Sequence, residues 1–107
     1  MKAKPVKLVY GEGYFNCSIE DATHVELNFP SPFFQQRHLP VILRGARDGT
    51  NCWSWNGDTE KPTLKPSIKT ECNEMVCHSF VNDGMVQFLS DCSHDLAGQT
   101  VDMLDIT

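Results

Sequence analysis

The sequence predicts a mainly β protein, a small sheet or barrel-like domain. Short runs of apolar and β-branched residues alternate with polar residues along much of the chain. The dipeptide Asp83-Gly84 separates two such runs, which is typical of a β-hairpin. No segment shows a clear helical spacing of apolar residues over ten or more positions. These three observations together favour strands joined by short turns.

The first half of the chain is expected to contain four strands. Residues 5–10 and 23–29 alternate side chains along an extended strand, residues 14–19 form a second short strand, and residues 39–44 are apolar and β-branched. The segment 33–38 is expected to form one helical turn. An α+β fold with one short helix is therefore the alternative to a purely β fold.

The middle of the chain is rich in tryptophan and proline. An extended segment at residues 52–57 places Trp53 and Trp55 on one face. Pro62 and Pro66 follow in an extended stretch that is not expected to be a central strand, because proline cannot donate to a sheet ladder. Two interpretations stay open: the tryptophans fill a small core, or the segment forms a groove wall. In the second interpretation the polar contacts come from Asn56, Thr63 and Ser67.

The clearest predicted element is the hairpin of residues 77–81 and 85–90. A two-residue loop at Asp83-Gly84 would place Val81 opposite Val86, and a three-residue loop would shift the pairing by one residue. With either loop, Cys77 and His78 come close to residues 91–94. A last short segment is expected at residues 96–101.

Size and charge restrict the class of protein. The 107 residues fit a single domain, residues 1–107. The net charge of −5 disfavours binding to nucleic acid, which depends mainly on lysine and arginine. No apolar run approaches the roughly 18 residues of a membrane span, and the first residues lack an apolar leader. A cytoplasmic protein is expected, in which the five cysteines are thiols or metal ligands.

A cluster of cysteine and histidine residues at the ends of the hairpin is the main candidate site. Zinc prefers four tetrahedral ligands of these types, and the candidate ligands are Cys77, His78, Cys92 and His94. Residues 92 and 94 point to one side of an extended segment, whereas residues 77 and 78 point to opposite sides of a regular strand. Cys72 in place of His78 gives an alternative ligand set with three cysteines and one histidine. The other interpretation is buried thiols and hydrogen-bonded imidazoles.

The same cluster also supports an enzymatic hypothesis. A cysteine beside a histidine can form a thiolate–imidazole nucleophile. Cys77 with His94, or Cys92 with His78, would serve, and Asp91 would orient the imidazole. A metal held by three side chains would instead activate a water molecule. The alternative function is therefore a metal-dependent or cysteine-dependent hydrolase with its site at Cys77, His78, Asp91 and His94.

Four motifs in the second half of the chain resemble a bacteriophage and prophage family of uncharacterised domains. They are Trp53-Ser54-Trp55-Asn56-Gly57-Asp58, Pro62-Thr63-Leu64-Lys65-Pro66-Ser67-Ile68, Cys77-His78-Ser79-Phe80-Val81-Asn82-Asp83-Gly84 and the run from Phe88 to Val101. Members of that family often carry the name ammonia monooxygenase. A membrane copper oxygenase needs spanning helices, which this sequence lacks.

The resemblance covers residues 52–101 and implies a phage-type domain with zinc as its cofactor. Many members carry an N-terminal Cys-Pro-x-Cys-Gly knuckle followed by a histidine. Here Cys17 and His24 match in part, whereas Glu20 stands at the second cysteine position. The first hypothesis is a small phage-encoded metal-binding accessory protein that binds a host macromolecule, with a host protein as the expected partner, as a host-takeover or anti-defence factor. Whether Cys17, Cys72 or Asp91 joins its site stays open at this point.

Overall fold

The computed structural model describes residues 1–32, 35–44 and 51–106. These residues form strands and no helix, which confirms the predicted mainly β class. The strands are β1 (Lys4–Val9), β2 (Gly13–Asn16), β3 (His24–Asn28), β4 (Gln36–Leu43), β5 (Trp53–Trp55), β6 (Leu64–Cys72), β7 (Met75–Asn82), β8 (Met85–Phe88) and β9 (Thr100–Asp102).

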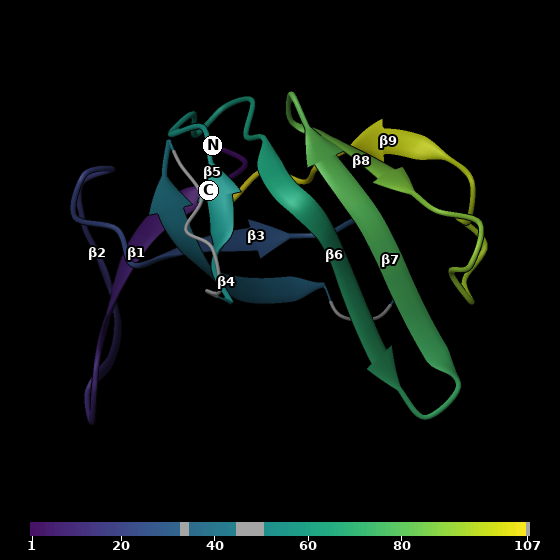
Figure 1. The fold of residues 1–107 in the computed structure, drawn as a ribbon, viewed down its shortest axis with the longest axis horizontal. Coiled ribbons are helices and arrows are strands. Elements are labelled where there is room, and N and C mark those ends of the chain that lie inside the picture. The colour runs from purple at the N-terminus through teal and green to yellow at the C-terminus, as the bar shows by residue number, and fades with distance from the viewer. Residues whose placement is uncertain (33–34, 45–50, 107) are drawn as a thin grey trace.

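All the strands belong to one mixed sheet in the order β2-β1-β3-β4-β5-β6-β7-β8-β9 (Figure 1). Neighbours are antiparallel except β4 and β5, which run parallel. The sheet is open, with β2 and β9 at its two edges, so the barrel-like form of the prediction is not reached. The described residues include no helix that is long and apolar enough to cross a membrane.

The helical turn expected at residues 33–38 is wrong for the part that the structure describes. Residues 36–38 begin β4, which pairs with β3 through His38↔Glu26 and Leu39↔Val25. Leu39 and Val41 are buried on one face of the strand, and the strand predicted at residues 39–44 begins earlier, at Gln36. Phe33 and Phe34 lie outside the described residues.

The inner face of the sheet carries the hydrophobic core. Trp55 is fully buried and packs in the same cluster as Leu64, Val81 and Phe88. Trp53 is only half-buried at the border of this cluster. The tryptophans therefore differ in role, because the core takes one ring completely and leaves the other near the surface.

Pro66 lies in a central strand, contrary to the sequence-based expectation. It belongs to β6, and the register with β7 shifts between Leu64 and Ile68. A bulge is one of the few places in a sheet where proline is tolerated, because no ladder hydrogen bond is lost there. The strand consequently runs from Leu64 through Pro66 to Cys72.

Two tight turns arrange β6, β7 and β8. Asp83 and Gly84 form a two-residue loop with φ values of 49° and 75°, as the Asp-Gly signal predicts. Val81 faces Val86 in this hairpin. A second turn, with Asn73 at φ 56°, closes the β6–β7 hairpin at Cys72↔Met75. The β6–β7 hairpin projects from the body of the sheet (Figure 1).

Candidate active site

Three polar side chains form a hydrogen-bonded line on the outer face of β6 and β7. The Nε2 atom of His78 lies 3.0 Å from the hydroxyl oxygen of Ser67. Its Nδ1 atom lies 3.0 Å and 3.2 Å from the two carboxylate oxygens of Asp91. The order serine, imidazole, carboxylate is that of a catalytic triad, which is recognised by geometry and not by sequence position.

The hydrogen bonds define the role of each group. Because a carboxylate only accepts hydrogen bonds, Nδ1 of His78 carries a proton and its N–H donates a hydrogen bond to Asp91. In the neutral imidazole, Nε2 is then the acceptor for the Ser67 hydroxyl. The hydrogen bond from His78 lowers the pKa of the Asp91 carboxyl, which keeps it ionised. This arrangement leaves a basic nitrogen beside the hydroxyl.

The bulge in β6 places Ser67 on the outer face. Ser67 follows Pro66 at the point where the register with β7 shifts. The indole N–H of Trp53 donates a hydrogen bond of 3.2 Å to the Ser67 carbonyl oxygen. The half-buried indole thus fixes the backbone that carries the hydroxyl.

Strand alternation directs His78 outward while Cys77 and Ser79 are buried. The His78 side chain is 20% exposed and lies opposite Lys69 of β6. The ammonium group of Lys69 lies 2.9 Å from Glu71 and 3.8 Å from Asp91. A positive charge therefore accompanies the carboxylate at the solvent side of the site.

The segment after β8 brings Asp91 to the histidine. Leu89 and Ser93 donate backbone hydrogen bonds of 2.9 Å to the carbonyl groups of His78 and Val76. Between them, the Cys92 sulfur accepts from the His78 N–H at 3.2 Å and donates to the His78 carbonyl at 3.1 Å. Residues 89–93 are consequently bound along the edge of β7 as a turn, which holds Asp91 beside the imidazole.

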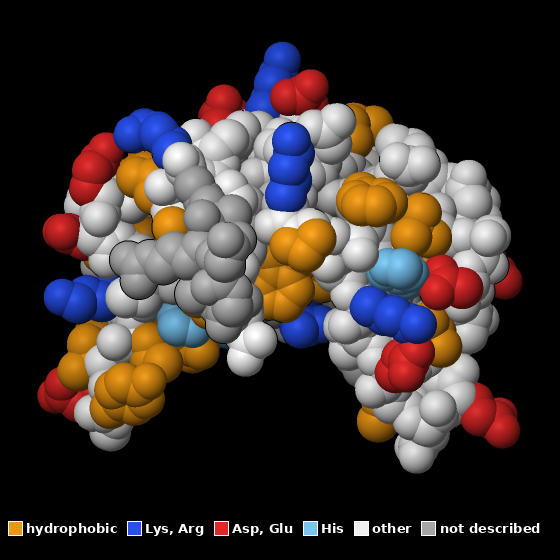
Figure 2. Space-filling view, in the orientation of Figure 1, with side chains coloured by type: hydrophobic (Ala, Val, Ile, Leu, Met, Phe, Trp, Pro, Cys, Tyr) orange, Lys and Arg blue, Asp and Glu red, His pale blue; other side chains and the backbone are white. Residues whose placement is uncertain are grey.

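Two surface hollows share Pro66, the residue before Ser67, as a lining residue. One has a volume of about 510 Å³ and is lined by Thr63, Leu64, Lys65, Pro66, Phe80, Val81, Asn82 and Gln87. The other has a volume of about 410 Å³ and is lined by Asn51, Cys52, Trp53 and Pro66. Figure 2 shows one face of the molecule, with a histidine beside acidic and basic side chains in the region of β6 and β7.

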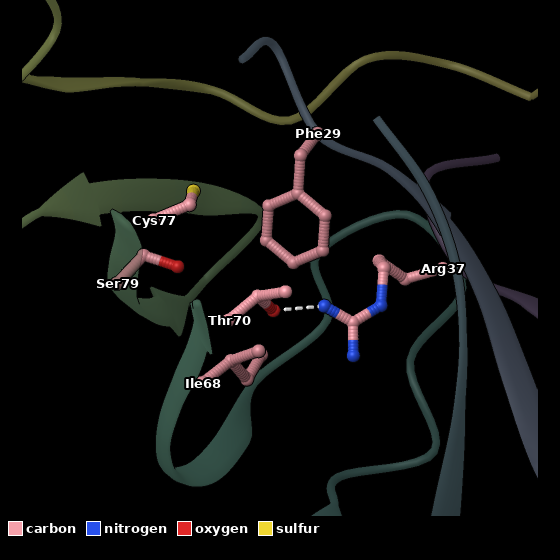
Figure 3. A pocket seen from close by; sticks show the side chains of 6 residues that line it. All are labelled: Phe29, Arg37, Ile68, Thr70, Cys77 and Ser79. Atoms are coloured by element: carbon pink, nitrogen blue, oxygen red, sulfur yellow. Dashed lines mark hydrogen bonds between the residues drawn. The ribbon is translucent and has the colours of Figure 1, made fainter. Parts of the chain in front are cut away.

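A third, much smaller cavity lies on the opposite side of the same strands (Figure 3). It is lined by Phe29, Arg37, Ile68, Thr70, Cys77 and Ser79 and has a volume of about 10 Å³. Arg37 donates a hydrogen bond to the Thr70 hydroxyl across it. The space suits about one water molecule, so this cavity is a packing feature of the inner face.

The structure does not bring all four predicted zinc ligands to one point, although the Cys77 and Cys92 thiols are neighbours in the core. Cys77 is buried on the inner face, whereas His78 is on the outer face. His94 is buried with its ring edge against Phe88, and its Nδ1 atom accepts from the Leu96 N–H at 3.2 Å. Among residues 1–32, 35–44 and 51–106, no group of three or more His, Cys, Asp or Glu is placed to hold a metal ion. This finding corrects the expectation of a metal-binding protein.

The histidine that adjoins Asp91 is paired with a hydroxyl and not with a thiol. Cys92 contacts the backbone of His78. Burial raises the pKa of the Cys77 thiol, which favours its unreactive protonated form. The sequence hypothesis grouped His78 with Asp91, and the structure shows this pair hydrogen-bonded. It missed Ser67 as the group that completes the line.

The site defines a class: a β protein that carries a serine-hydrolase type of triad on an open sheet. A comparison with protein families agrees with this class. The model of the BubE family, described as a bacterial ubiquitination-like system serine protease, matches residues 14–89. The chain belongs to the BubE family. Ser67 and His78 lie within the matched residues, and Asp91 lies just beyond them.

No match was found among curated proteins or among solved structures. The family corrects the first functional hypothesis, because it is a family of serine proteases and not of phage metal-binding proteins that bind a host protein. The expected bacteriophage and host–virus character is corrected by the same finding. The hydrogen-bonded line of Ser67, His78 and Asp91 lies on the opposite face of β7 from the Cys77 side chain.

Replacement of Trp53 by phenylalanine tests the support of Ser67. The variant loses the N–H that holds the Ser67 carbonyl, so we expect kcat/KM for a peptide substrate to fall roughly 3- to 10-fold and stability to fall by about 1 kcal/mol. Trp55→Phe is the control for activity, because its N–H donates to Asp58 instead; since Trp55 is fully buried, this variant should lose more stability than Trp53→Phe but less activity. Equal losses of activity in both variants would show that Trp53 has only a structural role.

We expect the protein to lose stability on acidification because the buried His94 side chain must take up a proton. Burial lowers the pKa of His94 below its ordinary value of 6.5, against an opposing effect of Asp95. The unfolded chain therefore binds this proton first, and stability falls as the pH drops below about 6.5. In His94→Asn the side-chain oxygen can still accept from Leu96, but it does not titrate. Urea midpoints at pH 7.5 and 5.5 should differ less in this variant; an unchanged difference would contradict the assignment.

Proposed function

We propose that this chain is a serine protease of a bacterial ubiquitination-like system, with Ser67 as the nucleophile, His78 as the general base and Asp91 as the orienting carboxylate. The observation that carries the proposal is the continuous hydrogen-bonded line from the Ser67 hydroxyl through His78 to Asp91. The match to the BubE family supports it from an independent direction.

The reaction follows from the position of each proton. His78 Nε2 takes the proton of the Ser67 hydroxyl while the serine oxygen attacks the carbonyl carbon of the scissile bond. The Asp91 carboxylate stabilises the imidazolium that forms. His78 then gives the proton to the leaving amine, and an acyl-enzyme ester remains on Ser67. Water, activated by the same imidazole, hydrolyses the ester and restores the hydroxyl.

The surroundings of Ser67 fit a polypeptide substrate. The two hollows that share Pro66 can accept side chains that flank the scissile bond. The larger one combines the apolar rings of Pro66 and Phe80 with the amides of Asn82 and Gln87. Phe80 is 43% exposed, so a large apolar surface is available for contact.

The proposal is tested by incubating the purified protein with a native bacterial lysate and counting new protein N-termini. We expect new termini with the wild-type protein, and we expect them to disappear after treatment with a fluorophosphonate, which reacts with activated serines. Addition of EDTA should leave the cleavage intact. Cleavage that survives the fluorophosphonate and is lost with EDTA would overturn the proposal, as would the absence of both labelling and cleavage.

A further inference from the structure

β6 has an unpaired edge directly beside the proposed nucleophile. The strand has nine residues, but β5 pairs with it only through Ser54↔Lys65 and Trp55↔Leu64. Beyond Lys65, no other strand of the described residues pairs with this side of β6. The three-residue length of β5 thus leaves an open edge that begins at the catalytic serine.

The register shows which backbone groups face the open side. Lys69 lies opposite His78, and Glu71 lies opposite Val76. His78 and Val76 use their backbone N–H and C=O groups to bind residues 89–93 on the far side of β7. Each of these antiparallel pairs is therefore one whose two residues are not hydrogen-bonded to each other. In such a pair the backbone N–H and C=O groups of each residue point away from the partner strand. The N–H and C=O groups of Lys69 and Glu71 therefore point toward the open side of β6.

The open edge ends at the reacting group. The Ser67 carbonyl oxygen already accepts a hydrogen bond from the Trp53 indole, so it is not free to pair with an added strand. A chain that pairs with Lys69 and Glu71 therefore reaches the last free backbone groups of the edge next to Ser67. In the space-filling view a hollow separates the arm formed by the β6–β7 hairpin from the rest of the molecule (Figure 2). An extended chain on this edge would lie along that hollow and would present a backbone carbonyl to the serine.

We propose that the substrate polypeptide binds as an added β-strand along the Lys69–Glu71 edge of β6. This inference rests on the proposed protease function and names its substrate class: a locally unfolded, extended segment, such as a chain terminus or a link between domains. Strand addition uses backbone hydrogen bonds for affinity and alternate side chains for specificity. A folded helix or an internal strand of a sheet has no free backbone groups to offer this edge.

The charges near the edge fit an uncharged backbone as the ligand. Lys69 is already paired with Glu71 and with Asp91, so neither side chain of the edge offers an unbalanced charge to a substrate. Charged residues on a strand edge also reduce uncontrolled pairing between protein copies. The edge is therefore suited to transient pairing with the backbone of a substrate.

A scan of peptide backbones tests the inference on the wild-type protein. Peptides from a digested bacterial proteome are first screened to find one that is cleaved, and that peptide is then N-methylated at one residue at a time. In either strand direction only alternate N–H groups of an added strand face the edge. We expect KM to rise roughly 3- to 10-fold at every second residue on one side of the cleaved bond, since each site removes one hydrogen bond. Effects without this alternation would overturn the inference.

A pair of variants gives a second readout. Glu71→Pro removes the outward-facing N–H, and Glu71→Ala removes the same carboxylate but keeps that N–H. The loss of peptide kcat/KM in the proline variant should exceed that in the alanine variant, mainly through KM, and should exceed any loss in the rate of labelling by a small fluorophosphonate. Equal losses for peptide and fluorophosphonate would contradict strand addition. If the wild-type protein is labelled and cleaves lysate proteins but no peptide, the inference fails and the protease function stands.

Discussion

The Ser67→Ala variant is expected to lose at least about 10³-fold in kcat for peptide cleavage, because the other members of a triad cannot replace the nucleophile. Labelling by a fluorophosphonate should disappear as well. The free energy of unfolding should change by no more than about 1 kcal/mol, since Ser67 is partly exposed and its hydroxyl makes one hydrogen bond to His78. Activity and labelling kinetics, together with a urea titration, measure both effects.

Ser18→Ala is the matched control for this variant. Ser18 is exposed and lies in the turn after β2, away from β6 and β7 in the sheet order. The Ser18→Ala variant should cleave peptides and react with the fluorophosphonate at the same rates as the wild-type protein. Peptide cleavage that persists in Ser67→Ala would show that another residue is the nucleophile.

The Asp91→Asn variant is expected to lose about 10²- to 10³-fold in kcat. The amide can neither hold the His78 Nδ1–H in the same way nor stabilise the imidazolium. A fully buried orienting aspartate, as in chymotrypsin-type proteases, contributes more than this, but Asp91 is 47% exposed and water can take over part of its role. The rates of peptide cleavage and of fluorophosphonate labelling should fall together.

Asp95→Asn controls for the loss of one surface charge, because Asp95 is exposed and makes its hydrogen bond through the backbone. The pH dependence of stability gives a separate check on Asp91. The bond from His78 lowers its pKa in the folded state, so its contribution is present above the ordinary carboxyl pKa and is lost as the pH falls through the lower folded value. The Asp91→Asn variant should not show this loss of stability at acidic pH. Wild-type activity in the Asp91→Asn variant would contradict the triad.

The strands of this fold could be predicted in large part because their signals are local. Alternating side chains locate β1, β3, β7 and β8, and the Asp83-Gly84 turn fixes one hairpin. The parallel pairing of β4 with β5 depends on contacts that no local pattern encodes. Pro66 concealed the central position of β6, because the general exclusion of proline from inner strands does not hold at a bulge.

The candidate site was predictable only in part for the same reason. The hairpin brings residue 78 close to residue 91, so a sequence argument could pair His78 with Asp91. Ser67 enters the site through the pairing of β6 with β7. Without a predicted β6, the sequence suggested Ser67 only as a polar contact of a groove wall and not as a partner of His78. The cysteines attracted the chemical hypothesis because they are reactive residue types, whereas Cys77 and Cys92 are buried.

The measurement that tests the central claim most directly is the location of a fluorophosphonate adduct by mass spectrometry of the intact protein and of its peptides. The triad predicts one adduct per chain, on Ser67, and a much slower reaction when His78 is replaced by alanine. An adduct on a different side chain, or a protein that cleaves its substrates without forming any adduct, would contradict the assignment of Ser67, His78 and Asp91.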